Sequence, residues 1–403
     1  MGGSLLELLA LGKQDAHLIG NPQITFFKSV HKRHTNFSIE PIAQFFYETP
    51  DFGKKVSCII DRKADLLSQI ILEIELPALQ TNVSWINGIG HHIIKKVELT
   101  IGGVTICSFS GEFMDIYSEL TLPSSQRAGY FKMLGKKSSY SRTSHESAMR
   151  LFVPLPFWFC RHIGNVLPLI AMQYSEVKVN VEFRPFNECW YSGTSMSITP
   201  TTQNITNVTL YCDFIYLDTF ERKKFATASN LEYLVEQIQI SENNDVTANN
   251  TNITANIYFN HPVKELIWVY QANAVSNTND WGNFSKTLDD DTTIQINNPP
   301  VTYCSLKFNG HDRIERRHAD YFRLVQPYQK HTTSPDDFIY VFNFCINPEK
   351  IQPTGTCNFS KIDMPQLLVE FGSSVPAGDV RVYAINYNIL KIKNGMVGLM
   401  YSS

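Results

Sequence analysis

The sequence contains one short pattern twice, once in each half of the chain. Residues 97–106 read V-E-L-T-I-G-G-V-T-I, and residues 305–314 read S-L-K-F-N-G-H-D-R-I. Three positions match in order, because Leu99, Ile101 and Gly103 recur as Leu306, Phe308 and Gly310. The pairs Gly102-Gly103 and Asn309-Gly310 suit hairpin turns that need positive φ. This repeat predicts two related β domains in tandem, since internal repeats decide the architecture before local patterns do.

Other matches fall in the same order along the two halves. Lys178–Phe183 (K-V-N-V-E-F) corresponds to Gln366–Phe371 (Q-L-L-V-E-F). Leu210–Leu217 and Val382–Leu390 are both rich in aromatic and branched residues and come last in their halves. The repeat unit is about half the chain, so it has the size of a domain rather than of a solenoid repeat.

Size and charge narrow the classes of protein. A chain of 403 residues with 43% hydrophobic content is long enough for two domains with large cores. A net charge of −3 argues against a dedicated nucleic-acid binder, which normally carries a basic surface. We therefore expect no direct nucleic-acid contact. The runs Glu221–Lys224 and Arg313–Arg317 are interpreted as solvated or intersubunit charges.

The sequence also bears on the compartment of the chain. No apolar stretch reaches the roughly 18 to 20 residues that span a bilayer, and Met1–Ala10 has no positively charged leader. The eight cysteines are scattered without a C-x-x-C pair, which indicates buried reduced thiols. We expect synthesis and folding in a cytosol.

Periodicity predicts mostly strands. Alternating apolar residues over Ile70–Leu76 and Val177–Phe183 are typical of antiparallel strands with one wet face. The stripe of Phe113, Ile116, Tyr117 and Leu120 instead predicts a short helix. About eight strands per half with long connections favour jelly rolls over up-and-down barrels.

The predicted fold class is all-β, with two tandem antiparallel eight-stranded jelly rolls, long loop insertions and a short N-terminal arm. The expected boundaries are an arm at residues 1–24, a first jelly roll at 25–218, a linker at 219–230 and a second jelly roll at 231–403. The longest insertion of the first half is Ser108–Arg150. Gln271–Thr302 and Thr332–Asp337 have few apolar anchors, so we expect these two loops to be exposed.

The leucines near the start leave two alternatives open. They form a short apolar stretch that either packs under its own domain or docks onto a partner or membrane surface. The residues expected to make the second kind of contact are Leu5, Leu6, Leu8 and Leu9.

Catalytic and metal-binding patterns are absent from the sequence. It contains no nucleophile elbow, phosphate loop, dinucleotide fingerprint or H-E-x-x-H motif. The histidines of His31/His34 and His91-His92 are interpreted as exposed or hydrogen-bonded rather than as ligands, because adjacent residues of an extended segment face opposite ways. Asp289–Asp291 is interpreted as an acidic exposed loop. We expect no enzyme activity, no cofactor and no metal.

The motif N-x-[ST] marks candidate glycosylation sites. The Asn-rich loops are the expected outer surface if glycans are present, and the candidates are Asn82, Asn204, Asn207, Asn249, Asn252 and Asn283, with further sequons at Asn36 and Asn358.

Several long motifs, running from near the first residue to the last, resemble a known family. They are Gly20–Phe37 (G-N-P-Q-I-T-F-F-K-S-V-H-K-R-H-T-N-F), Leu167–Lys178, Phe214–Arg222, Phe259–Pro262, Asn309–Arg313, Tyr321–Gln329, Pro353–Asp363 and Asn386–Tyr401. In this order they resemble the major capsid proteins of nucleocytoplasmic large eukaryotic DNA viruses of the algal-virus type. The loops, Ser108–Arg150 above all, have no match.

The resemblance implies a structural virion protein. It implies a homotrimer whose six barrels form a pseudo-hexagonal capsomer of an icosahedral shell, assembled in the host cytoplasm. Its implied partners are neighbouring capsomers, minor capsid and vertex proteins, an inner viral membrane near the N-terminal arm, and host surfaces at the outer loops. Six aromatic residues would then be buried in the core or at interfaces: Phe26, Phe27, Phe37, Tyr321, Phe322 and Tyr328.

Two other functions compete with a shell protein. A glycan-binding jelly roll would use Trp190, Tyr191 and Trp281, which we expect in exposed loops. A metal-dependent jelly-roll enzyme would need clustered histidines, which the sequence lacks.

Overall fold

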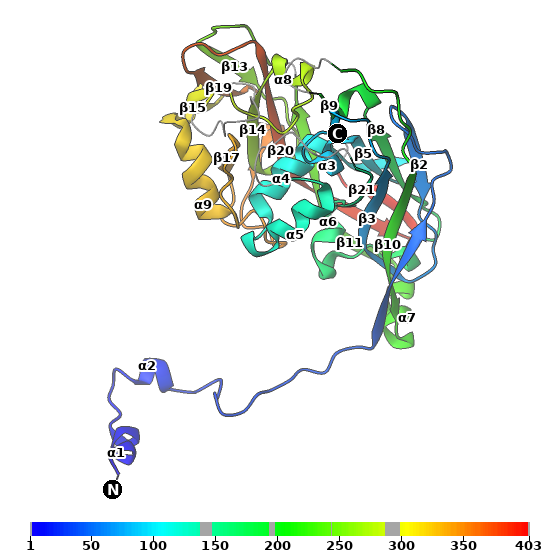
Figure 1. Cartoon of the computed structure of the whole chain (residues 1–403). Helices are drawn as coiled ribbons and strands as arrows, with labels where there is room; N and C mark the ends of the chain where they lie inside the picture. The colour runs from blue at the N-terminus through cyan, green and yellow to red at the C-terminus, as the bar shows by residue number, and fades with distance from the viewer. Residues whose placement is uncertain (1, 138–146, 193–197, 243, 287–298, 402–403) are drawn as a thin grey trace. The chain divides into compact units, whose positions relative to one another are not determined.

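The computed structural model describes residues 2–137, 147–192, 198–242, 244–286 and 299–401, which form two units (Figure 1). The first unit comprises residues 1–36 and the second residues 37–403. The described part of the first unit contains α1 (Gly3–Leu9) and α2 (Ala16–Ile19) and buries none of its side chains. The apolar residues of this segment therefore build no core of their own.

Two four-stranded antiparallel sheets form the first barrel. One sheet has the order β1 (Phe37–Gln44), β10 (Asn207–Leu217), β3 (Leu66–Leu76), β7 (Met149–Pro154). The other has the order β2 (Lys55–Ile59), β8 (Val177–Phe183), β5 (Ile94–Ile101), β6 (Val104–Ser110). A further pair joins β4 (Ser84–Trp85) to β9 (Trp190–Tyr191).

The second barrel repeats this strand order. Its first sheet runs β11 (Asn230–Ser241), β20 (Gly378–Lys393), β14 (Pro262–Ala272), β17 (Tyr340–Asn343), and its second runs β13 (Asn252–Asn256), β19 (Pro365–Phe371), β15 (Val301–Phe308), β16 (His311–His318). Three short strands extend the first sheet: β12 (Asp245–Val246), β18 (Cys357–Asn358) and β21 (Met396–Leu399). Each strand of the two four-stranded sheets of the first barrel thus has a counterpart, and the predicted duplication and double jelly roll are confirmed.

Alternation of side chains explains why these segments form strands. In β8 and β19 every second residue is buried and the residues between are half-buried. Such a pattern places one face of a sheet against a core and the other toward solvent. The cores of both barrels belong to one continuous cluster of buried apolar side chains, so the two barrels share a hydrophobic interior.

Helices occupy the connections. The predicted short helix is confirmed as α4 (Gly111–Thr121), whose N-cap Ser110 accepts a hydrogen bond from the Phe113 backbone N–H. It is followed by α5 (Ser124–Leu134), and at the same place in the second barrel the π-helix η4 (Tyr321–Val325) precedes α9 (Gln326–Lys330). The other helices are α3 (Ile89–His92), α6 (Trp158–Arg161), η1 (Ile163–Asn165), η2 (Leu169–Ala171), η3 (Phe186–Glu188), α7 (Thr219–Thr227), α8 (Asn273–Asn277) and η5 (Phe359–Lys361).

Both repeated hairpins have the turn that their sequences predict. Gly102 and Gly103 have φ of 59° and 84°, and Asn309 and Gly310 have φ of 52° and 82°. Two successive residues with positive φ match the right-handed twist of the flanking strands. Asparagine is one of the few other residues that tolerate this conformation, which explains how the two copies differ without losing the turn.

The predicted exposure of the loop Gln271–Thr302 is wrong for its described part. Trp281 and Phe284 are 8% and 3% exposed. Asn283 between them is buried because it hydrogen-bonds to Asp280 and Ser285, a pattern that low apolar content conceals. Asp289–Asp291 lies outside the described residues, as does part of the Ser108–Arg150 insertion. The loop Thr332–Asp337 is only partly exposed, because Thr332 is exposed but Pro335 is buried.

Candidate functional site

The surface along which the two barrels touch is called the seam here, and Figure 1 shows it with α4 between the strands of the first barrel at the right and those of the second at the left. Its centre is the contact of edge strand β6 with edge strand β11. The Gln237 side-chain amide on β11 donates a 2.6 Å hydrogen bond to the Ile106 carbonyl on β6. Beside it, the rings of Phe113 on α4 and Tyr383 on β20 lie 5.5 Å apart. Edge strands therefore cover each other at the seam.

Arg161 at the end of α6 is a charged link across the seam. Its guanidinium pairs with Glu236 on β11, and Glu236 also accepts a 2.6 Å hydrogen bond from the Lys264 ammonium on β14. Burial would raise the pKa of Glu236, but Lys264 and Arg161 outweigh burial and lower it. The Lys264 side chain is 1% exposed, so this ion pair depends on its partners rather than on water.

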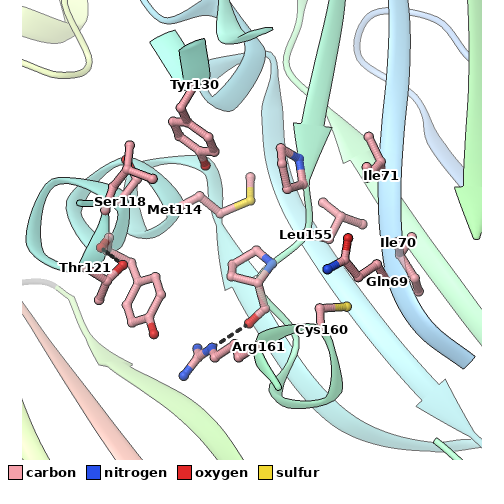
Figure 2. A pocket seen from close by; sticks show the side chains of 14 residues that line it. Gln69, Ile70, Ile71, Met114, Ser118, Thr121, Tyr130, Leu155, Cys160 and Arg161 are labelled. Atoms are coloured by element: carbon pink, nitrogen blue, oxygen red, sulfur yellow. Dashed lines mark hydrogen bonds between the residues drawn. The ribbon is translucent and has the colours of Figure 1, made fainter. Parts of the chain in front are cut away.

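A hollow of about 200 Å³ opens beside Arg161 between α4 and β3 (Figure 2). Met114 and Tyr130 come from the helical side, Gln69 comes from β3, and Leu155 follows β7. The Arg161 Nε–H donates a 3.2 Å hydrogen bond to the Pro156 carbonyl at its edge. The lining is mostly apolar, and the Ser118 and Thr121 hydroxyls donate hydrogen bonds to backbone carbonyls of α4.

A second charged cluster surrounds Lys136, which follows α5. Its ammonium lies 2.8 Å from an Asp115 oxygen and 2.7 Å from a Glu119 oxygen, two carboxylates one helical turn apart on α4. Arg127 also pairs with Glu119. Burial alone would raise the pKa of Asp115, but Lys136 and the hydrogen bond from His91 hold it well below its ordinary range. Asp115 is thereby kept ionised in the interior.

The second barrel contributes Asp337 to the surroundings of this cluster. Burial, reinforced by the charge of Glu119, raises the pKa of Asp337 to about 7. Asp337 and Lys136 line the same small recess. The charge balance of the seam therefore changes near neutral pH.

The loop after β14 holds the barrels together from the other side. The Trp281 indole N–H donates a 3.0 Å hydrogen bond to the Glu188 carbonyl, and its ring lies 4.1 Å from the Arg184 guanidinium. The Asn279 amide donates 2.8 Å hydrogen bonds to the carbonyls of Asn187 and Trp190. Residues of the second barrel thus satisfy backbone carbonyls of the first.

These contacts contradict the glycan-binding alternative. Trp190, Tyr191 and Trp281 are 5%, 3% and 8% exposed, so they do not form an exposed aromatic platform. Sugar-binding aromatic rings must present a face to solvent. The Trp281 ring instead packs at the seam against Arg184, and Trp190 and Tyr191 lie on the buried strand β9.

A buried histidine lies inside the second barrel. The His331 side chain is 1% exposed, and its ring nitrogens lie 3.2 Å from Glu265 and 3.1 Å from Glu349. Burial would lower the pKa of His331, but the two carboxylates raise it to about 9. His331 is therefore a cation at neutral pH.

The predicted partner-contact and aromatic residues fall into two groups. Leu5, Leu6, Leu8 and Leu9 all lie on α1 and are not buried by other residues of the segment 1–36, so both alternatives for these leucines stay predictions. Phe322 is a core residue at 1% exposure, and Tyr321 packs half-buried against the core.

Phe37 and Tyr328 are 52% and 83% exposed, so they are not core residues of the barrels. Phe26 and Phe27 lie in the segment 1–36, whose described residues bury no side chain among themselves. Their interface role stays a prediction.

Five of the six glycosylation candidates are exposed: Asn82, Asn204, Asn207, Asn249 and Asn252. Asn283 is the exception at 5% exposure. Its carbonyl oxygen accepts hydrogen bonds from the Ser285 backbone and hydroxyl, and its amide donates to Asp280. A glycan at Asn283 would have to break this folded loop, so that prediction is wrong.

The remaining polar residues are placed as follows. His91 and His92 lie on the short helix α3 rather than in an extended segment, and both are buried. His91 contacts Asp115 and the Tyr130 hydroxyl. Among the described residues, no three His, Cys, Asp or Glu side chains gather as metal ligands, and no helix is long and apolar enough to cross a membrane.

The cysteines fit the prediction of reduced thiols. All eight are free, six are buried and Cys160 and Cys357 are half-buried. Burial raises the pKa of Cys58 to about 12, which keeps the unreactive thiol form.

The sequence interpretation missed the charged residues of the seam. One usable signal was the pair Lys264-Glu265 inside an otherwise apolar strand, because charges in such positions are rarely buried without partners. Another was the spacing of Glu112, Asp115 and Glu119, which places three carboxylates on one face of α4.

Comparison with known proteins gives the family. A family model described as "Major capsid protein N-terminus" matches residues 25–218, and one described as "Large eukaryotic DNA virus major capsid protein" matches residues 221–398. The chain belongs to the major capsid proteins of large eukaryotic DNA viruses. It is 38% identical to the major capsid protein of Pyramimonas orientalis virus and 35% identical to that of Phaeocystis pouchetii virus, with 100% of each chain covered.

A solved structure agrees with this family assignment. A chain in the quasi-atomic model of the PBCV-1 virus capsid is 29% identical with a TM-score of 0.80, covering 94% of this chain and 100% of that one. The capsid protein described here is therefore a structural protein of a virion, and its fold is the double jelly roll.

Proposed function

We propose that this major capsid protein assembles as a homotrimer whose six barrels form a pseudo-hexagonal capsomer of an icosahedral shell. The observation that carries the proposal is the repetition of one strand order in two barrels fixed together by a buried seam. Three such chains offer six similar edges, and a block of that kind can tile a lattice through heterologous contacts. Its role is structural, and no catalytic step is proposed.

Light scattering of the purified full chain tests this proposal. A stable trimer that forms larger arrays at high concentration is the expected result. A chain that stays monomeric at all concentrations would contradict the proposed homotrimer.

The segment 1–36 is proposed to contact minor capsid or vertex proteins or an inner viral membrane. The leucines of α1 are exposed and contribute to no core within the segment, which is typical of an apolar surface that binds a partner. Deleting Met1–Gly20 should leave the trimer intact and impair particle assembly. The matched control is Glu7→Gln, which changes α1 without removing apolar area. A trimer lost on deletion would contradict the proposal.

The exposed asparagines Asn82, Asn204, Asn207, Asn249 and Asn252 are proposed as glycan acceptors on an outer surface that meets the host. The free, mostly buried cysteines are compatible with synthesis and assembly in host cytoplasm, where thiols stay reduced. Intact-mass measurement of virion-derived protein checks the glycans. An unmodified mass contradicts this part of the proposal alone.

A further inference from the structure

Two strands that cover each other at the seam have counterparts that are covered by nothing in the described chain. β6 and β11 are mostly buried or half-buried. Their counterparts are β16, in which all residues but Ile314 are exposed, and β1, whose first five residues are exposed. Within one chain, β6 and β11 therefore cover each other, whereas the corresponding strands β16 and β1 are both left exposed.

Shared bulges give the correspondence residue by residue. In the first barrel the register of β10 with β3 shifts between Asp213 and Phe214, and in the second barrel the register of β20 with β14 shifts between Asn386 and Ile385. When the two barrels are aligned at these register shifts, Phe214 of the first barrel corresponds to Asn386 of the second. Glu40, the partner of Phe214 on β1, then corresponds to Gln237, the partner of Asn386 on β11.

The repeated hairpins provide the other half of the correspondence. The ladder of β5 with β6 skips Ile106, and the ladder of β15 with β16 skips Arg313. In both hairpins the third residue after the two-residue turn forms a β-bulge, Ile106 in the first and Arg313 in the second. Arg313 therefore corresponds to Ile106, the residue whose carbonyl receives the hydrogen bond from Gln237.

We infer that β1 of one copy packs against β16 of a second copy of this chain as β11 packs against β6 within one chain. Glu40 then lies where Gln237 lies at the seam, and it faces Arg313 where Gln237 faces Ile106. An amide-to-carbonyl contact inside the chain becomes a carboxylate-to-guanidinium contact between copies. The inference rests on the proposed homotrimer and names the surfaces that form it.

Charge and apolar area on the two open surfaces are complementary. Glu40 and Arg313 are both exposed, and neither forms an ion pair with any described residue. Phe37 and Ile39 on β1 are 52% and 48% exposed beside Glu40. Opposing charges fix the register of such an interface, while apolar side chains supply most of the buried area.

The helices that follow β6 and β16 complete the analogy. At the seam, α4 contributes Phe113 to the contact with the neighbouring barrel. At the same place in the second barrel, Leu324 and Val325 on η4 are 44% and 38% exposed, and Tyr328 on α9 is 83% exposed. A contact of β1 with β16 would cover these residues as well. It is heterologous, so it closes into a ring only with a fixed number of copies, and three copies give six barrels.

Charge reversal on the full chain tests the inference. Glu40→Arg and Arg313→Glu should each raise the protein concentration at which the trimer half-dissociates by roughly tenfold to a hundredfold, because each places like charges together. The double variant restores opposite charges and should return that concentration close to the wild-type value. Asp245→Lys reverses an exposed charge on β12, which belongs to the other sheet of the second barrel, and should leave the trimer unchanged.

The outcomes separate this inference from the proposed function. Wild-type trimers with two weakened single variants and a rescued double variant support it. Wild-type trimers that neither single variant weakens, or a double variant as weak as the singles, overturn it while the homotrimer stands. A wild-type chain that is monomeric overturns the homotrimer itself, and this inference falls with it. Circular dichroism of each variant checks that the monomer is folded.

Discussion

The first and second barrels have the same strand order but opposite surroundings at the same two strands. β6 and β11 lie in the protein interior, where a side-chain amide and a backbone carbonyl are enough to join them. β16 and β1 carry charges at the corresponding bulge and edge. Exposed edge strands invite uncontrolled pairing, and charges on them restrict pairing to a complementary partner. The difference shows how a duplicated barrel can use one geometry for two kinds of contact.

The two barrels also differ in the helices that follow β6 and β16. α4 presents buried carboxylates that Lys136 neutralises, whereas η4 presents exposed Leu324 and Val325. The first arrangement is fixed within one chain and can hold charges in the interior. The second stays apolar and open, which suits a surface that is buried when it meets a copy.

The largest expected effect comes from removing the cation of the first barrel. Lys136→Met should lower the free energy of unfolding by about 3–5 kcal/mol, because Asp115 stays buried without its lysine partner and Glu119 keeps only Arg127. Urea denaturation followed by tryptophan fluorescence measures this change.

The matched control is a lysine on the surface of the same barrel. Lys95→Met removes an ion pair with Glu182 whose lysine is 56% exposed, and should cost less than about 1 kcal/mol. Equal losses in the two variants would mean that the Lys136 cluster is no more than a surface feature.

The second prediction concerns His331, the buried cation that follows α9 in the second barrel as Lys136 follows α5 in the first. Its raised pKa makes a stabilising contribution that is fully present below about pH 6.5 and is lost as pH rises through about 9. Over that window the free energy of unfolding should fall by about 2–3 kcal/mol. The measurement is a set of denaturation curves between pH 6 and 10.

Two variants isolate this titration. His331→Gln should flatten the upper part of the pH profile, and the exposed His318→Gln should leave its shape unchanged. Asp337 acts in the same direction at lower pH, because its raised pKa gives stability that is lost as pH rises through about 7. If the free energy of unfolding of His331→Gln falls with pH as steeply as that of the wild type, His331 is not the cause of the pH dependence.

The smallest effect tests whether the two hairpin turns are equivalent. Gly103 and Gly310 have φ of 84° and 82°, and an added Cβ at either would meet open space. Gly103→Ala and Gly310→Ala should therefore each cost about 1 kcal/mol, from backbone strain alone. Thermal unfolding of the two variants compares them directly. A difference well beyond that value would show that one turn has a neighbour that the other lacks.

Much of the fold could be predicted because it depends on periodicity. The alternation in β3 and β8, the stripe on α4 and the paired turn residues are local patterns, and each one matches the structure. The duplication followed from three matching positions in one hairpin. Local chemistry was sufficient wherever a residue's role depends on its neighbours in sequence.

The seam could not be predicted in the same way. Arg161 and Glu236 are far apart in sequence, and nothing near either residue specifies the other. The loop around Trp281 and Asn283 has a polar composition typical of exposed loops, yet it is buried because distant carbonyls accept its hydrogen bonds. Aromatic content alone also predicts burial for Phe26 and Phe27, but the described residues of the segment 1–36 build no core that could bury them.

The hydrogen bond from Trp281 to Glu188 has a consequence for how the chain can be divided. The helix α7 between the barrels looks like a place to cut, but a fragment that ends there would leave the carbonyls of Asn187, Glu188 and Trp190 without donors. A fragment that begins there would expose the Trp281 indole. The duplicated unit is one barrel, but the two barrels together form the unit that folds.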